Sequence, residues 1–226
     1  MQRRLTALYR RDARGRTTEL NQWDGGTPPR FHLARTREGN AWLIRADVSD
    51  ETAEALAALA ADEAHPPDPF AAPRHGAAYL HLLGVDPAAP GVSSGPAYWF
   101  QRLPPAVPGT VAIGADNAHL LRGGLEAWLP DVGHRQPMVA MLQSGRAVAI
   151  CASVRISAAS HEAGVETLPS HRRRGFAAAV VSGWAHAARR RGVDTLFYST
   201  SWDNVASQGV ARRLGLTLIG TDFSVR

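Results

Sequence analysis

Hydrophobic positions follow two clearly different periods from residue 109 onward. Short apolar or alternating runs, which are typical of strands, cover residues 110–113, 138–142, 147–156, 161–168, 193–200 and 216–225. Apolar residues that recur every three to four positions, as on one face of a helix, cover residues 117–128, 176–191 and 204–214. The pattern predicts the order β-α-β-β-β-α-β-α-β, in which a tight Ser144-Gly145 turn joins two strands of a hairpin.

The longest of these predicted helices has the clearest packing face. Phe176, Val180, Trp184 and Ala188 repeat every four residues, so their side chains lie along one side of the helix. Gly192 follows directly, and glycine is common just beyond a helix C-terminus. We therefore expect a helix that packs on a sheet and ends just before this glycine.

The first 106 residues show a weaker pattern. Their predicted elements are strands at 31–34, 41–46 and 79–83, and a helix that Ser49-Asp50 caps and that runs through Ala61. Several prolines between residues 104 and 108 mark a boundary. We predict an N-terminal α/β domain over residues 1–106, which has no motif with a chemical mechanism, and a second domain over residues 107–226.

The composition is that of a globular protein. Of the 226 residues 45% are hydrophobic, and no apolar run approaches the roughly 18 residues that a membrane span needs. Arginines interrupt the N-terminal segment, so we expect no signal peptide and a cytoplasmic location. The single cysteine, Cys151, excludes an internal disulfide and is expected to be a buried apolar side chain. The histidines show no metal-ligand spacing, so we predict no metal.

The chain contains no lysine, and its 25 basic residues are all arginines against 20 acidic residues, for a net charge of +5. Runs such as residues 172–174 and 189–191 suit nucleic acids, and that interpretation predicts a steeply salt-dependent affinity. However, acidic residues offset most of this charge, and residues 189–191 lie where a helix C-terminus favours cations. We therefore expect neither a nucleic-acid nor a membrane partner.

One basic turn has the character of an anion site. A predicted strand stops at Pro169, three arginines follow at 172–174, and a helix opens at Gly175. Unpaired backbone N–H groups and the helix dipole place partial positive charge at such a junction, and the arginines add formal charge. The turn is therefore a candidate phosphate site, at which Gly175 permits close approach because it lacks a Cβ atom.

The turn also carries a family motif. The GCN5-related N-acetyltransferase (GNAT) superfamily has the signature Arg/Gln-x-x-Gly-x-Gly/Ala, which stands here as residues 172–177, Arg-Arg-Arg-Gly-Phe-Ala. About 30 residues later, at the spacing of one βαβ unit, Asn204, Ser207 and the ending Arg213-Leu214-Gly215-Leu216 fit the family's second signature region. Residues ~107–226 therefore resemble a GNAT domain. The first 106 residues lack both signatures, and are either a degenerate partner half or an added domain that completes the substrate cleft.

This resemblance implies a fold, a donor and a set of binding residues. The fold is of the α/β (α+β) class, a mixed and mostly antiparallel sheet whose fourth and fifth strands splay apart, flanked by helices. The donor is acetyl-CoA, with CoA as product and an amine as acceptor. The residues expected to bind the cofactor are Thr167, Leu168, Arg172, Arg173, Arg174, Gly175, Phe176, Ala177, Asn204 and Ser207. The Thr167 N–H group is a candidate for polarising the thioester carbonyl.

Strand alternation selects a candidate general base. Glu162, Gly164 and Glu166 share one face of their strand, and Glu166 lies nearer the basic turn. We predict Glu166 as the base, with partial burial and acting directly or through water; alternatively it is a salt-bridge partner of a nearby arginine. Glu162 and His161 are the candidates for docking the acceptor amine.

The family's usual general acid is missing. Many members carry a tyrosine seven residues after the asparagine, and that position is Ala211 here. Tyr198 or Ser199 could protonate the departing thiolate, or water could, because a thiol has a pKa of about 8.5. Tyr198 could equally be a core aromatic residue.

We therefore expect an enzyme, an N-acetyltransferase that moves acetyl directly from acetyl-CoA to an amine. The alternative is a non-catalytic GNAT-fold module that binds CoA or acyl-CoA for sensing or assembly, and Ala211 favours it. Peptide N-termini, lysine side chains, polyamines, aminoglycosides and small metabolites are all acceptors compatible with this fold. Dimers are common in the family, so a homodimer is among the expected states.

Overall fold

The computed structural model describes residues 1–63, 71–88 and 90–226. The chain forms two compact units, neither of which is continuous in sequence. Unit 1 comprises residues 1–98, 199–205 and 218–226, and unit 2 comprises residues 99–198 and 206–217. Both ends of the chain therefore belong to unit 1. The domain boundary at 106/107 expected from the sequence stays a prediction.

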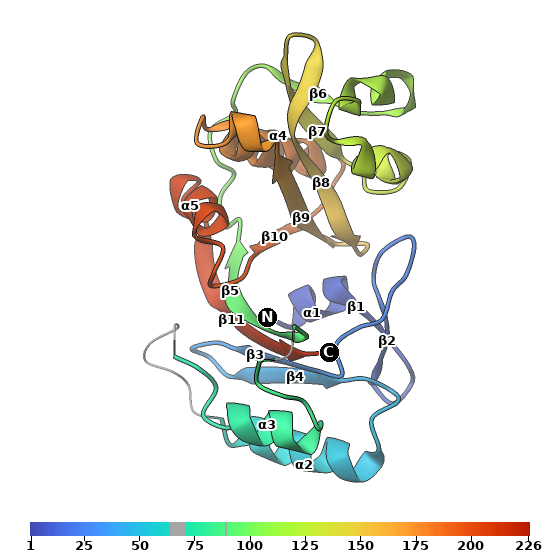
Figure 1. The fold of residues 1–226 in the computed structure, drawn as a ribbon, viewed down its shortest axis with the longest axis vertical. Helices are drawn as coiled ribbons and strands as arrows, with labels where there is room; N and C mark the ends of the chain where they lie inside the picture. Colours follow the sequence, from blue (N-terminus) through green and yellow to red (C-terminus); the bar gives the residue numbers. More distant parts are fainter. Residues whose placement is uncertain (64–70, 89) are drawn as a thin grey trace. The chain divides into compact units, whose positions relative to one another are not determined.

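Unit 1 is built on a sheet with the strand order β4-β3-β11-β5 (Figure 1). These strands span Asn40–Ile44 (β4), Phe31–Arg35 (β3), Thr217–Val225 (β11) and Val92–Trp99 (β5). β3 pairs antiparallel with β4 on one side and with β11 on the other. The C-terminal strand is thus an interior strand of this sheet.

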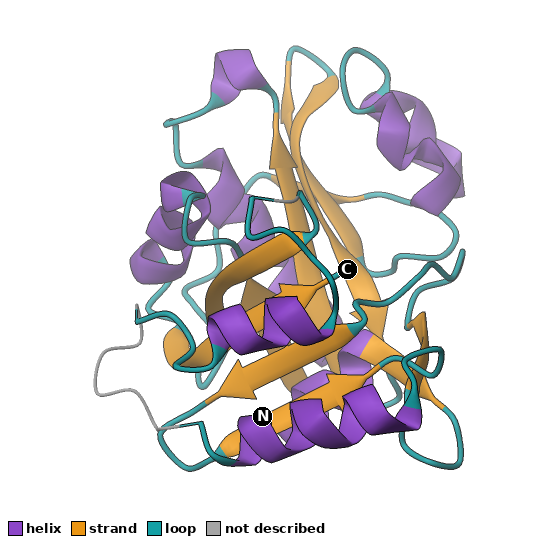
Figure 2. Cartoon of the chain, turned by 60° about the horizontal axis from the view of Figure 1, so that its bottom comes forward, coloured by secondary structure: helices purple, strands orange, loops and turns teal. Residues whose placement is uncertain are grey.

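Two layers cover the opposite faces of this sheet. Phe31 and Leu33 point to the face that carries helices α2 (Asp50–Ala61) and α3 (Gly76–Leu82), which lie side by side in Figure 2. Ala34 packs on the other face, with helix α1 (Gln2–Leu8) and the hairpin of β1 (Tyr9–Arg11) and β2 (Thr17–Leu20). β3 is consequently buried along its whole length.

The sequence predicted the strands at 31–34 and 41–46 and helix α2 correctly; Ser49 caps α2 by accepting a hydrogen bond from the Thr52 N–H group. The strand expected at residues 79–83 is wrong, because residues 79–82 lie in α3 and Leu83 is its C-cap residue. The buried Glu63 carboxylate accepts hydrogen bonds from the backbone N–H groups of Arg74 and His75 and from the Tyr79 hydroxyl. These contacts hold the start of the helix, and they come from a residue outside the apolar run.

Unit 2 is built on a sheet with the strand order β10-β9-β8-β7-β6. These strands span Thr195–Ser199 (β10), Ser160–Thr167 (β9), Arg146–Ile156 (β8), Met138–Gln143 (β7) and Thr110–Ala112 (β6). β6 to β9 pair antiparallel in succession, and β10 alone is parallel to its neighbour β9. The expected mixed, mostly antiparallel sheet flanked by helices is confirmed. Cys151 is buried in β8, also as expected.

Helix α4 (Phe176–Arg190) packs on one face of this sheet, with Trp184 fully buried. Its Gly183 approaches β6 so closely that an added Cβ would lie 2.9 Å from the Thr110 hydroxyl oxygen. Helix α5 (Val205–Arg213) follows β10, and no helix in the described ranges has the length and apolar character required to cross a bilayer.

The opposite face of the sheet is covered by a segment that the sequence predicted as one helix over residues 117–128. It forms two 3₁₀ helices instead, η1 (Ala115–Leu121) and η2 (Glu126–Asp131). Gly123 and Gly124 separate them with φ angles of +112° and +127°, and the Glu126 carboxylate accepts hydrogen bonds from both of their N–H groups. The apolar spacing was correct for packing, since Leu121 and Leu125 are buried, but the two glycines interrupt the helix.

Candidate functional site

The two strands that precede and follow α4 separate within the sheet. β9 and β10 pair only from Ser160 to Glu162 and from Thr195 to Phe197, although β9 continues to Thr167. The expected splayed pair is therefore present, as the pair β9 and β10. It leaves one edge of β9 without its neighbour over residues 163–167.

The hydrogen-bond alternation of β9 decides which backbone groups face that edge. Leu168 donates its N–H to the Val148 carbonyl of β8 at 2.9 Å, and Thr167 stands opposite Ala149. Because hydrogen-bonded and non-hydrogen-bonded pairs alternate in an antiparallel ladder, the N–H of Thr167 points away from β8. The Thr167 N–H is thus directed to the side where β10 has diverged, whereas the Leu168 N–H is already used.

The basic turn joins β9 to α4. The chain passes through the single turn η3 (Pro169–His171) and then adopts positive φ angles at Arg173 (60°) and at Gly175 (84°). Gly175 is the N-cap residue of α4, and no side chain among the described residues caps the helix there. Within that part of the chain the N-cap therefore gives the first N–H groups of α4 no side-chain acceptor, and these groups add to the positive end of the helix dipole.

Four guanidinium groups come from this region. Arg172 donates from Nε to the Thr167 carbonyl at 3.3 Å, and Arg174 lies over the Phe176 ring at 4.9 Å from its centroid. A Cβ atom added to Gly175 would lie 3.5 Å from Nη2 of Arg213, the last residue of α5. Within the described residues none of these three arginines, nor Arg173, forms an ion pair with a carboxylate. The turn can therefore hold an anion without displacing an acid.

Glu166 differs from the expectation in its exposure and in its partner. The expected partial burial is wrong, because Glu166 lies near the end of β9 and is exposed. Its Oε2 atom accepts a hydrogen bond of 2.6 Å from the indole N–H of Trp128, which belongs to η2. The alternative of an arginine partner is not what the structure has: the partner is an uncharged donor, which restricts the carboxylate without neutralising it.

The two other acidic and basic candidates of β9 lie on opposite faces of the strand. Glu162 is buried at the last pair of the β9–β10 ladder, with 4% of its surface exposed, and by alternation it shares the face of Glu166. His161 lies under α4, where its Nδ1 atom is 2.9 Å from the Ser153 hydroxyl, which also accepts from Trp184 at 3.0 Å. Burial, assisted by the nearby Arg191, lowers the pKa of His161 to about 4.

The structure places one general-acid candidate against α5. The Tyr198 side chain is buried, and its hydroxyl lies 2.6 Å from the Ser207 hydroxyl. Ser207 and Ala211 are four residues apart and share one face of α5, so the phenol reaches the face where the family's tyrosine would stand. Ser199 and Asn204 belong to unit 1, and their assigned roles stay predictions.

Sequence reasoning missed two residues of this region. Trp128 was counted only as part of an apolar stripe, and nothing in the sequence indicated that its N–H reaches a residue 38 positions away. Arg213 was noted as part of a signature, but not as a group beside the turn. The available signal was that the second signature contains a basic residue, Arg213, in addition to the arginines of the first signature.

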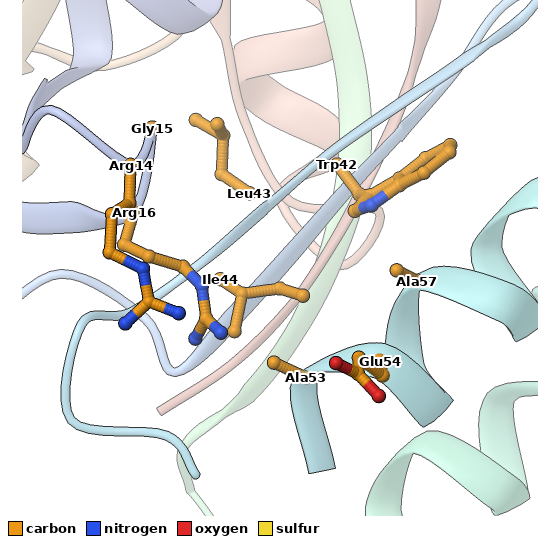
Figure 3. Close-up of a pocket in the computed structure, with 9 residues that line it drawn as sticks. All are labelled: Arg14, Gly15, Arg16, Trp42, Leu43, Ile44, Ala53, Glu54 and Ala57. Atoms are coloured by element: carbon orange, nitrogen blue, oxygen red, sulfur yellow. The ribbon is translucent and has the colours of Figure 1, made fainter. Parts of the chain in front are cut away.

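Unit 1 contains a separate groove of about 290 Å³, which Figure 3 shows. It lies between the loop with Arg14 and Arg16, strand β4 with Trp42, and the first turns of α2. Both guanidinium groups donate to the same oxygen of Asp50, at 2.8 and 2.9 Å. The Asp50 carboxylate therefore balances one of their two positive charges within unit 1, and none of the predicted site residues lines this groove.

Comparison with known proteins agrees with this fold. The family model described as GNAT acetyltransferase matches residues 139–221. A GCN5-related N-acetyltransferase-like protein from Streptococcus suis is 15% identical, with a TM-score of 0.51 over 88% of this chain and 85% of that chain. A putative GNAT acetyltransferase from Novosphingobium aromaticivorans is 19% identical, with a TM-score of 0.48 over 62% and 69% of the two chains.

A GNAT-family acetyltransferase from Colwellia psychrerythraea is 14% identical, with a TM-score of 0.46 over 82% of this chain and 76% of that chain. A search of curated proteins finds no match. The family model covers residues 139–221, which include both signature regions, and the Streptococcus suis protein shares the fold, so the resemblance inferred from the two signatures is confirmed.

Proposed function

We propose that this protein is an acetyl-CoA-dependent N-acetyltransferase that moves an acetyl group directly to an amine. The observation that carries the proposal is the turn at Gly175. There the N-terminus of α4 and arginines that pair with no carboxylate in the described residues meet beside the open edge of β9. CoA contains a diphosphate, and N–H donors together with positive charge bind phosphate groups.

The residues of the turn fit the cofactor. The backbone N–H groups of residues 173–177 would hold the diphosphate. Gly175 allows this because it has no Cβ atom in the way and adopts the positive φ angle that the turn requires. The Thr167 hydroxyl oxygen is buried without a hydrogen-bond partner in the described residues, so a polar group seated beside the turn would satisfy it. Charged hydrogen bonds contribute roughly 1.5–3 kcal/mol each, so an arginine and several N–H groups suffice to anchor the cofactor.

The reacting end would lie along the open edge of β9. Acetyl-CoA supplies an acetyl group activated as a thioester. The Thr167 N–H is directed to this edge and is the donor we assign to the carbonyl oxygen, on which negative charge develops during acyl transfer. Within unit 2, Ser207 is the residue we assign to the other side of the pantetheine arm.

Two further residues handle protons in this proposal. Glu166 accepts a proton from the amine, directly or through water, and its exposure leaves it accessible to an acceptor that arrives from solvent. Tyr198 is the acid we favour, because its hydroxyl reaches the α5 face of Ala211; Ser199 is the alternative. Glu162 and Glu166 make this face of β9 acidic, which suits a cationic amine.

A second candidate function rests on Ala211. This residue is fully buried, and its side chain has no group that could donate a proton to the leaving thiolate. The alternative is therefore a non-catalytic module that binds CoA or acyl-CoA for sensing or assembly. The two functions share the cofactor site and differ in turnover. Acetyl transfer from acetyl-CoA, assayed over a panel of peptide and small-molecule amines, separates them.

Cofactor binding is tested by a thermal shift with CoA and acetyl-CoA at millimolar concentration. Both should raise the melting temperature, because a ligand that binds only the folded state stabilises it. Gly175→Val should abolish this shift, since valine adds a branched side chain and disfavours the positive φ. Gly133→Val is the control, because no atom of the described residues lies within 4 Å of its added Cβ. A wild-type protein that neither compound stabilises would exclude both functions.

A further inference from the structure

Arg213 belongs to the second signature region, but the sequence assigned it no contact at the basic turn. It ends α5, it is exposed, and its guanidinium lies against Gly175, where an added Cβ would be 3.5 Å from Nη2 and 3.6 Å from Cζ. Within the described residues its side chain forms no ion pair or hydrogen bond. A flexible arginine side chain on a helix surface ordinarily extends into solvent, so its position beside another helix N-terminus requires a reason.

Electrostatics do not favour this position in the absence of an anion. The α4 N-terminus carries about half a positive charge, and Arg172, Arg173 and Arg174 lie in the same turn. A further guanidinium there is repelled by like charges. A cation in the last turn of α5 does complement the dipole of α5, but the adjacent Arg212 supplies that equally. The contact with Gly175 therefore distinguishes Arg213 from its neighbour.

We propose that Arg213 is a diphosphate ligand of the cofactor site, holding from α5 the same anion that the N–H groups of α4 hold from the other side. The inference rests on the proposed function, because it takes the anion to be the diphosphate of CoA. A guanidinium presents a planar set of donors that matches phosphate oxygens. Binding would then connect the last turn of α5 to the first turn of α4, two elements of unit 2 that the sequence separates by 36 residues, from 177 to 213.

The experiment compares Arg213→Ala with Arg212→Ala in the full-length protein. The two variants remove the same charge from the same helical turn, and both residues are exposed. Isothermal titration gives the dissociation constants of CoA, of dephospho-CoA, which retains the diphosphate, and of pantetheine, which has no phosphate. The melting temperatures without ligand show whether either substitution affects folding.

Arg213→Ala should weaken the binding of CoA and of dephospho-CoA roughly 10- to 100-fold, which is the loss expected for one charged hydrogen-bonding group. It should leave the dissociation constant of pantetheine unchanged. Arg212→Ala should change each constant less than about threefold, and Arg213→Lys should restore part of the affinity, because it keeps the charge but not the planar donors. The slope of affinity against salt concentration should also fall in Arg213→Ala alone.

Three results would overturn the inference. Equal constants for Arg213→Ala and Arg212→Ala would show that Arg213 contributes only general charge. An equal loss of affinity for pantetheine would show that Arg213 acts through the stability of α5. A loss of affinity for CoA but not for dephospho-CoA would assign Arg213 to the 3′-phosphate. A wild-type protein that binds none of the compounds would instead reject the proposed function itself, and the inference with it.

Discussion

Trp128 distinguishes Glu166 from other exposed carboxylates of the chain. Its indole N–H donates to Oε2 at 2.6 Å and so restricts the directions in which the carboxylate can point. A general base must point in a fixed direction to accept a proton efficiently. The indole would provide this orientation without the charge of an arginine, which would compete with a cationic amine.

Trp128→Phe tests this role because it keeps the ring and removes the donor. If Glu166 is the base, kcat/KM should fall roughly 10-fold, because the carboxylate is no longer held in place, and CoA affinity should be unchanged. Glu166→Gln should lower kcat/KM by about 10²–10⁴. Trp23→Phe, at an exposed tryptophan of unit 1, is the control.

The result would contradict the role of Trp128 if the kcat/KM of Trp128→Phe matched that of the wild type while Glu166→Gln remained impaired. If Glu166→Gln turned over normally, the assignment of the base would be wrong instead. Either outcome leaves the cofactor site untouched, because neither residue belongs to the turn at Gly175.

Local signatures made the cofactor side of the site predictable, because residues 172–177 are contiguous and their chemistry depends on backbone N–H groups. Trp128 could not be predicted in the same way. Its contact with Glu166 depends on how η2 crosses the sheet, and that depends on the interruption at Gly123 and Gly124. Apolar spacing identified the packing face but carries no information on such a break.

The interface between α4 and β9 contains a buried polar chain. Trp184 of α4 donates to Ser153 of β8, whose hydroxyl is also hydrogen-bonded to His161 of β9. The chain connects the helix to two strands through their side chains. Because burial lowers the pKa of His161 to about 4, this histidine is neutral in the folded protein at neutral pH.

His161 should therefore make stability depend on pH. The unfolded chain binds a proton near pH 6.5 and the folded chain only near pH 4, so His161 stabilises the fold fully above about 6.5 and loses this contribution as the pH falls toward 4. Urea unfolding at pH 7 and 5 should show wild type losing about 2 kcal/mol more than His161→Asn, which keeps an acceptor for Ser153 but does not titrate. Equal losses would mean that His161 titrates normally in the folded state.

Unit 1 is held together by contacts between the two ends of the described chain. Arg4 of α1, with 2% of its side chain exposed, pairs with Asp222 of β11 at 2.6 Å, and His32 of β3 lies 3.3 Å from the same carboxylate. Burial opposes the charge of Asp222, yet Arg4 and His32 lower its pKa to about 2. Sequence patterns are local, so a pairing between positions 4 and 222 could not be predicted from them.

Arg4→Met should destabilise the protein by about 3–5 kcal/mol in chemical denaturation, because it leaves a buried carboxylate without its cation. Arg14→Met, which breaks a pair with Asp50 that is 66% and 62% exposed, should cost less than about 1 kcal/mol. The double variant Arg4→Met/Asp222→Leu should recover part of the loss, since it removes both charges. If Arg4→Met cost no more than Arg14→Met, the buried pair would contribute little.

The interior position of β11 has a consequence for biogenesis. During synthesis β3 and β5 emerge long before the strand that separates them, so each exposes an unpaired edge until residues 217–225 follow. Such edges are templates for pairing with other chains, and long-range strand pairing is slow. A nascent or truncated chain without β11 should therefore depend on chaperones, and its yield should respond to chaperone supply more strongly than that of the whole chain.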